Sequence, residues 1–215
     1  MWVRLPPWAL LISKTMEETL EIKEDNEAEK KLLFDKIYQE ALAKEGNIIE
    51  FEGPYSKKEF LDYVVKNYDV VLHGSNNKDI GEFEPRQANC ASKKFGNMIG
   101  VYATEDDVLP MFYAIKDTEK FQGTAQSGYS RAHNEDGGVI DKKYEFKISP
   151  HLLEVQPWSD GIVYILPKNS FEQGTDDDGN AIDEWMSKTP VKPIAKLNLA
   201  PEEFPYFNDI KAIEE

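Results

Sequence analysis

The chain contains little cysteine and little histidine. Its 215 residues include one cysteine, Cys90, and three histidines, His73, His133 and His151. A single cysteine cannot form a disulfide within the chain, and it excludes the cysteine-rich classes of zinc site. No HExxH pattern pairs the histidines, which argues against a zinc hydrolase. We therefore expect neither a disulfide nor a metal ion, and we interpret Cys90 as a packing or loop thiol.

Positive charge and long apolar runs are also scarce. Lysine and arginine number 25 against 40 acidic residues, which gives a formal net charge of -15. A surface of this sign repels phosphate backbones and disfavours general nucleic-acid binding, except through a local basic groove. No apolar run is long enough to span a membrane, and the run Trp8–Ile12 is shorter than the core of a typical signal peptide. We therefore expect a cytoplasmic protein that does not bind membranes.

The apolar residues that are present predict a helix near the N-terminus. Hydrophobic residues make up 40% of the chain, which fits a folded protein rather than a disordered one. Leu33, Ile37 and Ala41 recur every four residues, a spacing that predicts a helix over 27–45. Gly46 follows directly and is the expected helix stop.

Two further helices and several strands are predicted downstream. Ser56 and Glu59 form the sequence signature of a capping box, and the helix that they begin leads into a buried strand at 70–72. A short helix is predicted over 106–116, with Asp106 as its N-cap. Further strands are predicted at 47–53, 99–104, 144–149, 152–155, 161–167 and 191–199.

Two polar stretches separate the predicted strands. Residues 117–142 form a long polar insert, interpreted as a surface loop or a lid, and residues 172–184 form an acidic loop. Helices followed by many short strands indicate an α+β fold with a mostly antiparallel or split sheet, not a doubly wound one. We expect an N-terminal arm and helix over 1–55 and one larger domain over 56–215.

Three motifs follow one another in a fixed order. The apolar strand at 70–72 ends in His73-Gly74-Ser75, where a structural histidine is the alternative to a binding residue. Tyr102 lies in the stretch Gly-Val-Tyr-Ala-Thr of the next predicted strand, and Tyr113 follows it by eleven residues on the predicted helix. Glu184 precedes the last predicted strand, which contains Val-Lys-Pro. Each motif alone is weak, whereas the ordered set is more specific.

This ordered set resembles the ADP-ribosyltransferase superfamily, in the His-Tyr-Glu branch related to diphtheria toxin and the poly-ADP-ribose polymerases. In the polymerases one strand ends in His-Gly-Ser and a second carries Gly-x-Tyr-Phe-Ala, where Ala103 replaces the phenylalanine here. The resemblance covers roughly residues 70–200, and much of that span matches only in the order of its motifs. It implies an α+β, ADP-ribosyltransferase-like split antiparallel β-sheet core with N-terminal helices, and a catalytic domain over 56–215.

The resemblance also implies an activity and the residues that carry it. Such enzymes break the nicotinamide–ribose bond of NAD through an oxocarbenium-like transition state and transfer ADP-ribose to an acceptor. Glu184 would stabilise the developing positive charge. Tyr102 and Tyr113 would sandwich the nicotinamide, and the Gly74 backbone would bind its carboxamide. His73 would bind the adenosine-side ribose. The catalytic set is thus Glu184, His73 and Tyr102, and the NAD-binding set is His73, Gly74, Ser75, Tyr102 and Tyr113.

The sequence also bears on the acceptor of ADP-ribose and leaves other functions open. Ile182 stands where arginine-specific transferases carry Glu or Gln, so arginine is not the indicated acceptor. We expect NAD as substrate and a macromolecular acceptor, protein rather than nucleic acid, modified with single units, in a toxin or phage–host setting. Arg131 or His133 of the polar insert could contact phosphate. The alternatives are an NAD glycohydrolase, a degenerate NAD-binding protein, and an unrelated interaction protein that uses its acidic surface.

Overall fold

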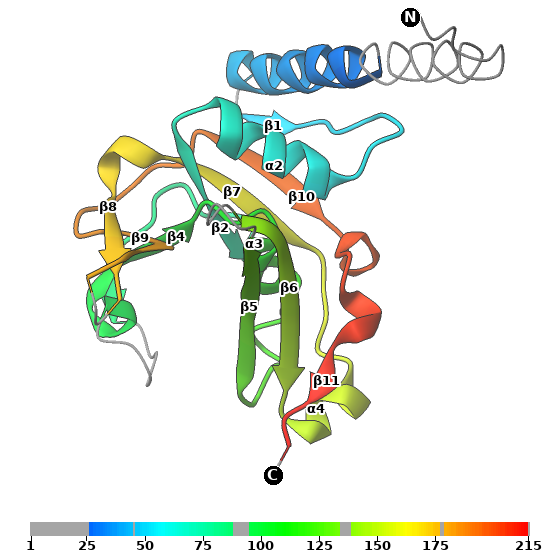
Figure 1. Ribbon diagram of the computed structural model, residues 1–215, viewed down its shortest axis with the longest axis vertical. Helices are drawn as coiled ribbons and strands as arrows, with labels where there is room; N and C mark the ends of the chain where they lie inside the picture. Colours follow the sequence, from blue (N-terminus) through cyan, green and yellow to red (C-terminus); the bar gives the residue numbers. More distant parts are fainter. Residues whose placement is uncertain (1–25, 45, 88–94, 134–138, 177–178, 215) are drawn as a thin grey trace, which may run out of the picture.

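The computed structural model describes residues 26–44, 46–87, 95–133, 139–176 and 179–214 (Figure 1). The predictions about the N-terminal stretch and about Cys90 lie outside these residues. The fold is α+β, as predicted. A large sheet has the strand order β1-β10-β7-β2-β4-β9-β8, with β3 paired to β4, and a smaller sheet has the order β11-β6-β5. None of the described helices combines the length and the apolar character that a membrane crossing requires.

The strands of the large sheet are β1 (Ile48–Ile49), β2 (Val70–Ser75), β3 (Arg86–Gln87), β4 (Ile99–Thr104), β7 (Gly161–Pro167), β8 (Glu172–Thr175), β9 (Ala181–Ser187) and β10 (Ala195–Leu199). The small sheet contains β5 (Ala125–His133), β6 (Val139–Ile148) and β11 (Lys211–Ala212). The labelled helices are α2 (Lys57–Asn67), α3 (Leu109–Ala114) and α4 (Pro150–Val155), with 3-10 turns η1 (Phe95–Asn97), η2 (Lys168–Ser170), η3 (Pro201–Glu203) and η4 (Phe207–Asp209). Residues 26–43 are helical as well.

The local signals of the N-terminal part are confirmed. Both hydrogen bonds of the capping box are present at the start of α2, between Ser56 and Glu59. Gly46, with a φ of 81°, follows the first helix as predicted. Phe34 from that helix packs edge-on against Phe60 of α2, with 5.5 Å between the ring centroids. The first helix therefore shares the hydrophobic core of the sheet, and the predicted boundary at residue 55 stays a prediction.

Three predicted elements are wrong or incomplete. Residues 152–155 belong to the helix α4, because Pro150 stands in the first turn of a helix, where proline is tolerated. The polar insert 117–142 contains the strand β5, and the acidic loop 172–184 contains β8 and part of β9. These strands carry polar residues on both sides and have no apolar run that could reveal them. By contrast, the strands predicted at 99–104 and 161–167 coincide with β4 and β7.

The strand pairing of the large sheet is shortest between two of its central strands. β2 pairs with β7 over six residues, from Val70↔Pro167 to Ser75↔Ile162. Its pairing with β4, on the other edge, is confined to Leu72↔Thr104. β2 and β4 therefore separate after Leu72, at the position where the His-Gly-Ser stretch begins. β4 in turn pairs with β9 through four residues, so that β2, β4 and β9 are consecutive strands.

The helix α3 lies directly on the backbone of β2 and β7. A Cβ atom added at Gly74 would lie 1.8 Å from the carbonyl oxygen of Pro110, and one added at Gly161 would lie 1.8 Å from that of Ala114. The β5–β6 hairpin covers the outer side of α3, where Phe112 and Phe146 pack with 4.9 Å between their centroids (Figure 1). Gly74 is therefore required by packing, whatever else its backbone does.

We expect Gly74→Ala to lower the free energy of unfolding by about 1–3 kcal/mol, because the added methyl group forces α3 away from β2. Urea unfolding would measure the change. Gly128→Ala is the matched control, since nothing lies within 4 Å of a Cβ at that strand position. Equal unfolding midpoints for the two variants would show that α3 moves away without cost.

Candidate functional site

The elements that carry the predicted site residues lie together where β2 and β4 separate. His73, Gly74 and Ser75 end β2, Tyr102 lies in β4, and Glu184 lies in β9. The remaining residue, Tyr113, is on α3, above β2. Glu184 therefore lies inside a strand rather than ahead of one, which corrects the prediction that it precedes the strand beginning at 191.

Strand register decides which side chains share a face of the sheet. Glu184 is opposite Thr104, and Thr104 is opposite Leu72, so these three side chains point to the same face as Tyr102 and α3. The neighbouring residue of β2, His73, points to the other face, where its ring packs against Phe83 with 4.7 Å between centroids. His73 and Glu184 therefore point to opposite faces of the sheet, on either side of the unpaired stretch between β2 and β4, which is called the opening below.

The His73 ring is tied to the far side of that opening. Its Nδ1 lies 2.6 Å from the carbonyl oxygen of Tyr102, which requires a proton on Nδ1 and leaves Nε2 as an acceptor. Burial lowers the pKa of His73, and the hydrogen bond to the Tyr102 carbonyl partly opposes this shift. The His73 ring is therefore neutral at pH 7, and its Nδ1–H donates to the backbone of β4.

This burial predicts a dependence of stability on pH. Because the folded-state pKa lies below the unfolded value, the unfolded chain binds the proton more tightly. The contribution of His73 to the unfolding free energy is therefore fully present above the pKa of the unfolded chain, about 6.5. It is lost as the pH falls through the lower pKa of the folded state. We expect His73→Gln, whose amide can still donate to the Tyr102 carbonyl, to flatten the loss of unfolding free energy between about pH 7 and pH 5.

The measurement is urea unfolding at a series of pH values. His151→Gln is the matched control, because His151 is exposed and makes its contact through Nε2 to a backbone carbonyl. The interpretation fails if the two variants have the same pH profile.

The backbone of Gly74 faces the opening. The amide of Lys168 donates to the carbonyl of Asp69 at 3.1 Å, just before the antiparallel pairing of β2 with β7. This bond shows which residues of β2 exchange hydrogen bonds with β7. Hydrogen-bonding groups alternate between the two edges of a strand. The odd-numbered residues of β2 therefore bond to β7, and the N–H and C=O of Leu72 and Gly74 point toward β4. Leu72 finds Thr104 there, whereas no described strand pairs with Gly74 on that edge.

Ser75 and Tyr102 have structural partners in addition to any ligand. The Ser75 hydroxyl accepts a hydrogen bond from the amide of Asn77 at 3.2 Å, which closes the turn after β2. The Tyr102 hydroxyl lies 2.9 Å from the carbonyl oxygens of Phe95 and Met98 and accepts from the Met98 amide at 3.0 Å. Its hydrogen bonds thus fix the Tyr102 ring against the turn before β4.

Tyr113 is the most exposed of the predicted site residues. Its side chain is 40% exposed, and its hydroxyl lies 2.9 Å from that of Ser127 on β5. The ammonium group of Lys116 lies 5.2 Å from the centroid of its ring. The Tyr113 ring is therefore held through its hydroxyl and has the Lys116 ammonium over one face, while it remains partly open to solvent.

A network of charges next to Glu184 fastens the β5–β6 hairpin to the sheet. Asp183 accepts from Tyr129, from Arg131 at 2.7 Å and from Lys142 at 3.2 Å. The Lys142 ammonium also bonds to Asp106, at 2.8 Å. Burial opposes ionisation of Asp183, but the hydrogen bonds from Tyr129 and Arg131 lower its pKa below the usual range. The hairpin is thus anchored one residue from the candidate catalytic carboxylate.

Sequence reasoning found only part of this network. The prediction of Asp106 as the N-cap is wrong by two residues, because α3 begins at Leu109 with Val108 as its N-cap. The Asp106 Oδ1 nevertheless accepts from the amides of Val108 and Leu109 at the start of the helix. Arg131, predicted as a phosphate contact, is instead paired with Asp183. The side chain of His133 lies outside the described residues. Asp183 carried no recognisable signal, because its strand was interpreted as a loop.

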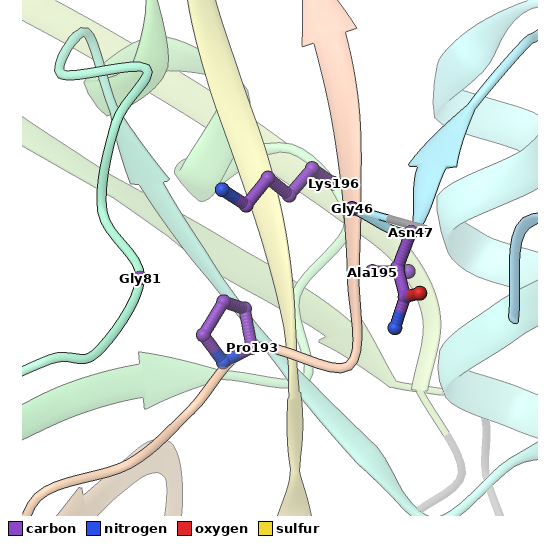
Figure 2. Close-up of a pocket in the computed structure, with 6 residues that line it drawn as sticks. All are labelled: Gly46, Asn47, Gly81, Pro193, Ala195 and Lys196. Carbon is purple, nitrogen blue, oxygen red and sulfur yellow. The ribbon is translucent and has the colours of Figure 1, made fainter. Parts of the chain in front are cut away.

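A cavity of about 200 Å³ lies elsewhere in the molecule. Figure 2 shows its lining, in which Lys196 of β10 points across the hollow. The lining residues are Gly46, Asn47, Gly81, Pro193, Ala195 and Lys196. None of the predicted site residues is among them. Within the described part of the chain, no group of three His, Cys, Asp or Glu side chains is arranged to hold a metal ion.

Comparisons with known proteins add no relative. No protein-family model, no curated protein and no solved structure matches the chain. The function must therefore be argued from the residues and the geometry described above.

Proposed function

We propose that the chain is an NAD-dependent ADP-ribosyltransferase of the His-Tyr-Glu type, with an ADP-ribosyltransferase-like split sheet. The observation that carries the proposal is the unpaired edge of Gly74 in the opening between β2 and β4. His73 and Tyr102 flank this opening, and the strand that carries Glu184 is next to β4. Motifs that are far apart in the sequence thus belong to three consecutive strands.

Nicotinamide would bind in this opening through its carboxamide and its ring. A carboxamide offers two N–H donors and one carbonyl acceptor, and the Gly74 backbone offers one acceptor and one donor in reciprocal order. The ring would lie near Tyr113, whose side chain is exposed on the same side of the sheet. Contact with aromatic faces adds about 0.5–1.5 kcal/mol per pair to the binding free energy.

Glu184 would act on the ribose. As the bond to nicotinamide breaks, positive charge develops on the ring carbon and oxygen, and a fixed carboxylate stabilises that charge more than it stabilises the ground state. Glu184 and Tyr102 share one face of the sheet, and the ribose attached to the bound nicotinamide would lie on that face. The neutral His73, with Nε2 as an acceptor, suits a ribose hydroxyl donor on the opposite face.

The test uses NAD labelled in its adenylate part. We expect the protein to release nicotinamide from NAD and to leave the label on a macromolecular acceptor in a cell extract. Release of nicotinamide with all the label recovered as free ADP-ribose would identify an NAD glycohydrolase, because water would then be the acceptor. If nicotinamide is not released and NAD does not raise the melting temperature, the proposal is wrong.

A further inference from the structure

Among the described residues, Lys116 is a lysine without a carboxylate partner, in a protein of strongly acidic composition. It follows α3 by two positions, and its ammonium lies 5.2 Å from the Tyr113 ring centroid and 4.9 Å from that of Phe121. In the described part of the chain, no carboxylate lies within ion-pair distance of it. Many other described lysines have such a partner, among them Lys57, Lys58, Lys142 and Lys168.

The backbone around Lys116 is held in place beside the end of β2. The carbonyl of Ile115 accepts from Ser159 at 3.0 Å, and the amide of Asp117 donates to Pro157 at 3.0 Å. The Thr118 hydroxyl donates to the side chain of Asn76, just after β2, at 3.2 Å. The ammonium is therefore presented from a fixed segment next to the opening.

The cost of this arrangement suggests a ligand. Burial lowers the pKa of Lys116, and no nearby negative charge offsets the effect. The two aromatic faces compensate by only about 0.5–2 kcal/mol and leave the three N–H donors of the ammonium without strong acceptors. An anion that reaches the group would supply both the charge and the acceptors.

We propose that Lys116 binds the pyrophosphate of the dinucleotide whose nicotinamide lies at Tyr113, an inference that rests on the proposed function. Lys116 lies just beyond the end of α3, and its ammonium is 5.2 Å from the Tyr113 ring centroid, so that the two side chains are neighbours. In a nicotinamide dinucleotide, one ribose separates the ring from the pyrophosphate. Two adjacent side chains would thus recognise two adjacent parts of one substrate.

The test compares two ligands in Lys116→Met. We expect the Kd of NAD to rise about tenfold, the loss of one charge-assisted contact, whereas the Kd of nicotinamide riboside, which has no phosphate, stays unchanged. Lys116→Arg should retain most of the NAD affinity. Lys143→Met, at an exposed lysine of β6, is the matched control and should bind both ligands normally. Calorimetry would measure the affinities, and urea unfolding would establish that each variant is folded.

Each other result overturns the inference in a recognisable way. Equal losses for NAD and nicotinamide riboside would mean that Lys116 acts only by packing against Tyr113. Unchanged affinity for NAD would mean that the phosphates lie elsewhere. In both cases wild-type protein still releases nicotinamide from NAD, and the proposed function stands. If wild-type protein neither binds nor cleaves NAD, both proposals are wrong.

Discussion

Glu184→Gln is expected to slow the release of nicotinamide from NAD by about 10²–10³-fold while leaving the affinity for NAD within about threefold. The substitution keeps the size and the hydrogen-bonding atoms of the side chain but removes its charge. The charge matters most when the ribose becomes oxocarbenium-like, so kcat should fall while ground-state binding changes little. The measurement is the steady-state release of nicotinamide together with equilibrium binding of NAD.

Glu172→Gln is the matched control for this prediction. Glu172 lies on β8, opposite Met186 of β9, and is paired at the surface with Lys188 at 3.1 Å. The Glu172→Gln variant removes a charge of the same sign from the strand next to β9. It should leave the rate of nicotinamide release within about twofold of the wild type, because exposed charges are screened at this range. If both variants release nicotinamide as fast as the wild type, Glu184 is not the catalytic carboxylate. If both lose activity equally, the effect is one of overall charge.

The parts of the fold that could be predicted depend on short-range signals. The capping box at Ser56 and the apolar runs that became β4 and β7 are local, and each is recovered. The polar strands β5 and β9 are stabilised by their partners in the sheets rather than by their own pattern, so nothing in their sequence separates them from loops. α4 was mistaken for a strand because Leu152 and Leu153 are apolar, although Pro150 begins a helix.

The candidate site, like the fold, could be predicted only in part from the sequence. Its motif residues could be proposed from their order along the chain, because each belongs to a short recognisable stretch. The contacts that hold these residues in place could not be predicted, because they join residues that are distant in the sequence. Asp106 binds Lys142, which is 36 residues away, and Thr104 binds Asp183, which is 79 residues away. Such contacts depend on the path of the hairpin in three dimensions. The packing role of Gly74 against Pro110 is likewise visible only once α3 is placed.

Asp106 joins these long-range contacts, and its replacement should cost more stability than any other substitution considered. Its carboxylate is completely buried. Oδ2 accepts from the Lys142 ammonium at 2.8 Å and from the Tyr144 hydroxyl at 2.7 Å, and Oδ1 accepts from the amides of Val108 and Leu109 at 2.9 and 2.8 Å. A single side chain therefore binds the amides at the start of α3 and anchors the β5–β6 hairpin.

We expect Asp106→Ala to lower the free energy of unfolding by about 3–5 kcal/mol, because it leaves a partly buried ammonium and a partly buried hydroxyl without their closest carboxylate acceptor. Asp106→Asn should cost less, since an amide oxygen can still accept from the amides of Val108 and Leu109 while the charge is lost. Urea unfolding would measure both variants. Asp62→Ala, which removes a surface ion pair with Lys66 on α2, is the matched control and should cost no more than about 1 kcal/mol.

A double-mutant cycle would assign the loss to the charge network rather than to the hydrogen bonds at the start of α3 alone. If Asp106 and Lys142 act as one unit, Lys142→Met should cost less in the Asp106→Asn background than in the wild type, because the ammonium has then already lost the closer of its two carboxylate partners. Additive losses would mean that Asp106 and Lys142 act independently. Hydrogen exchange gives the structural counterpart: Asp106→Ala should reduce the protection of β5 and β6 more than that of β7, since the hairpin loses its anchor while the centre of the large sheet keeps its own partners.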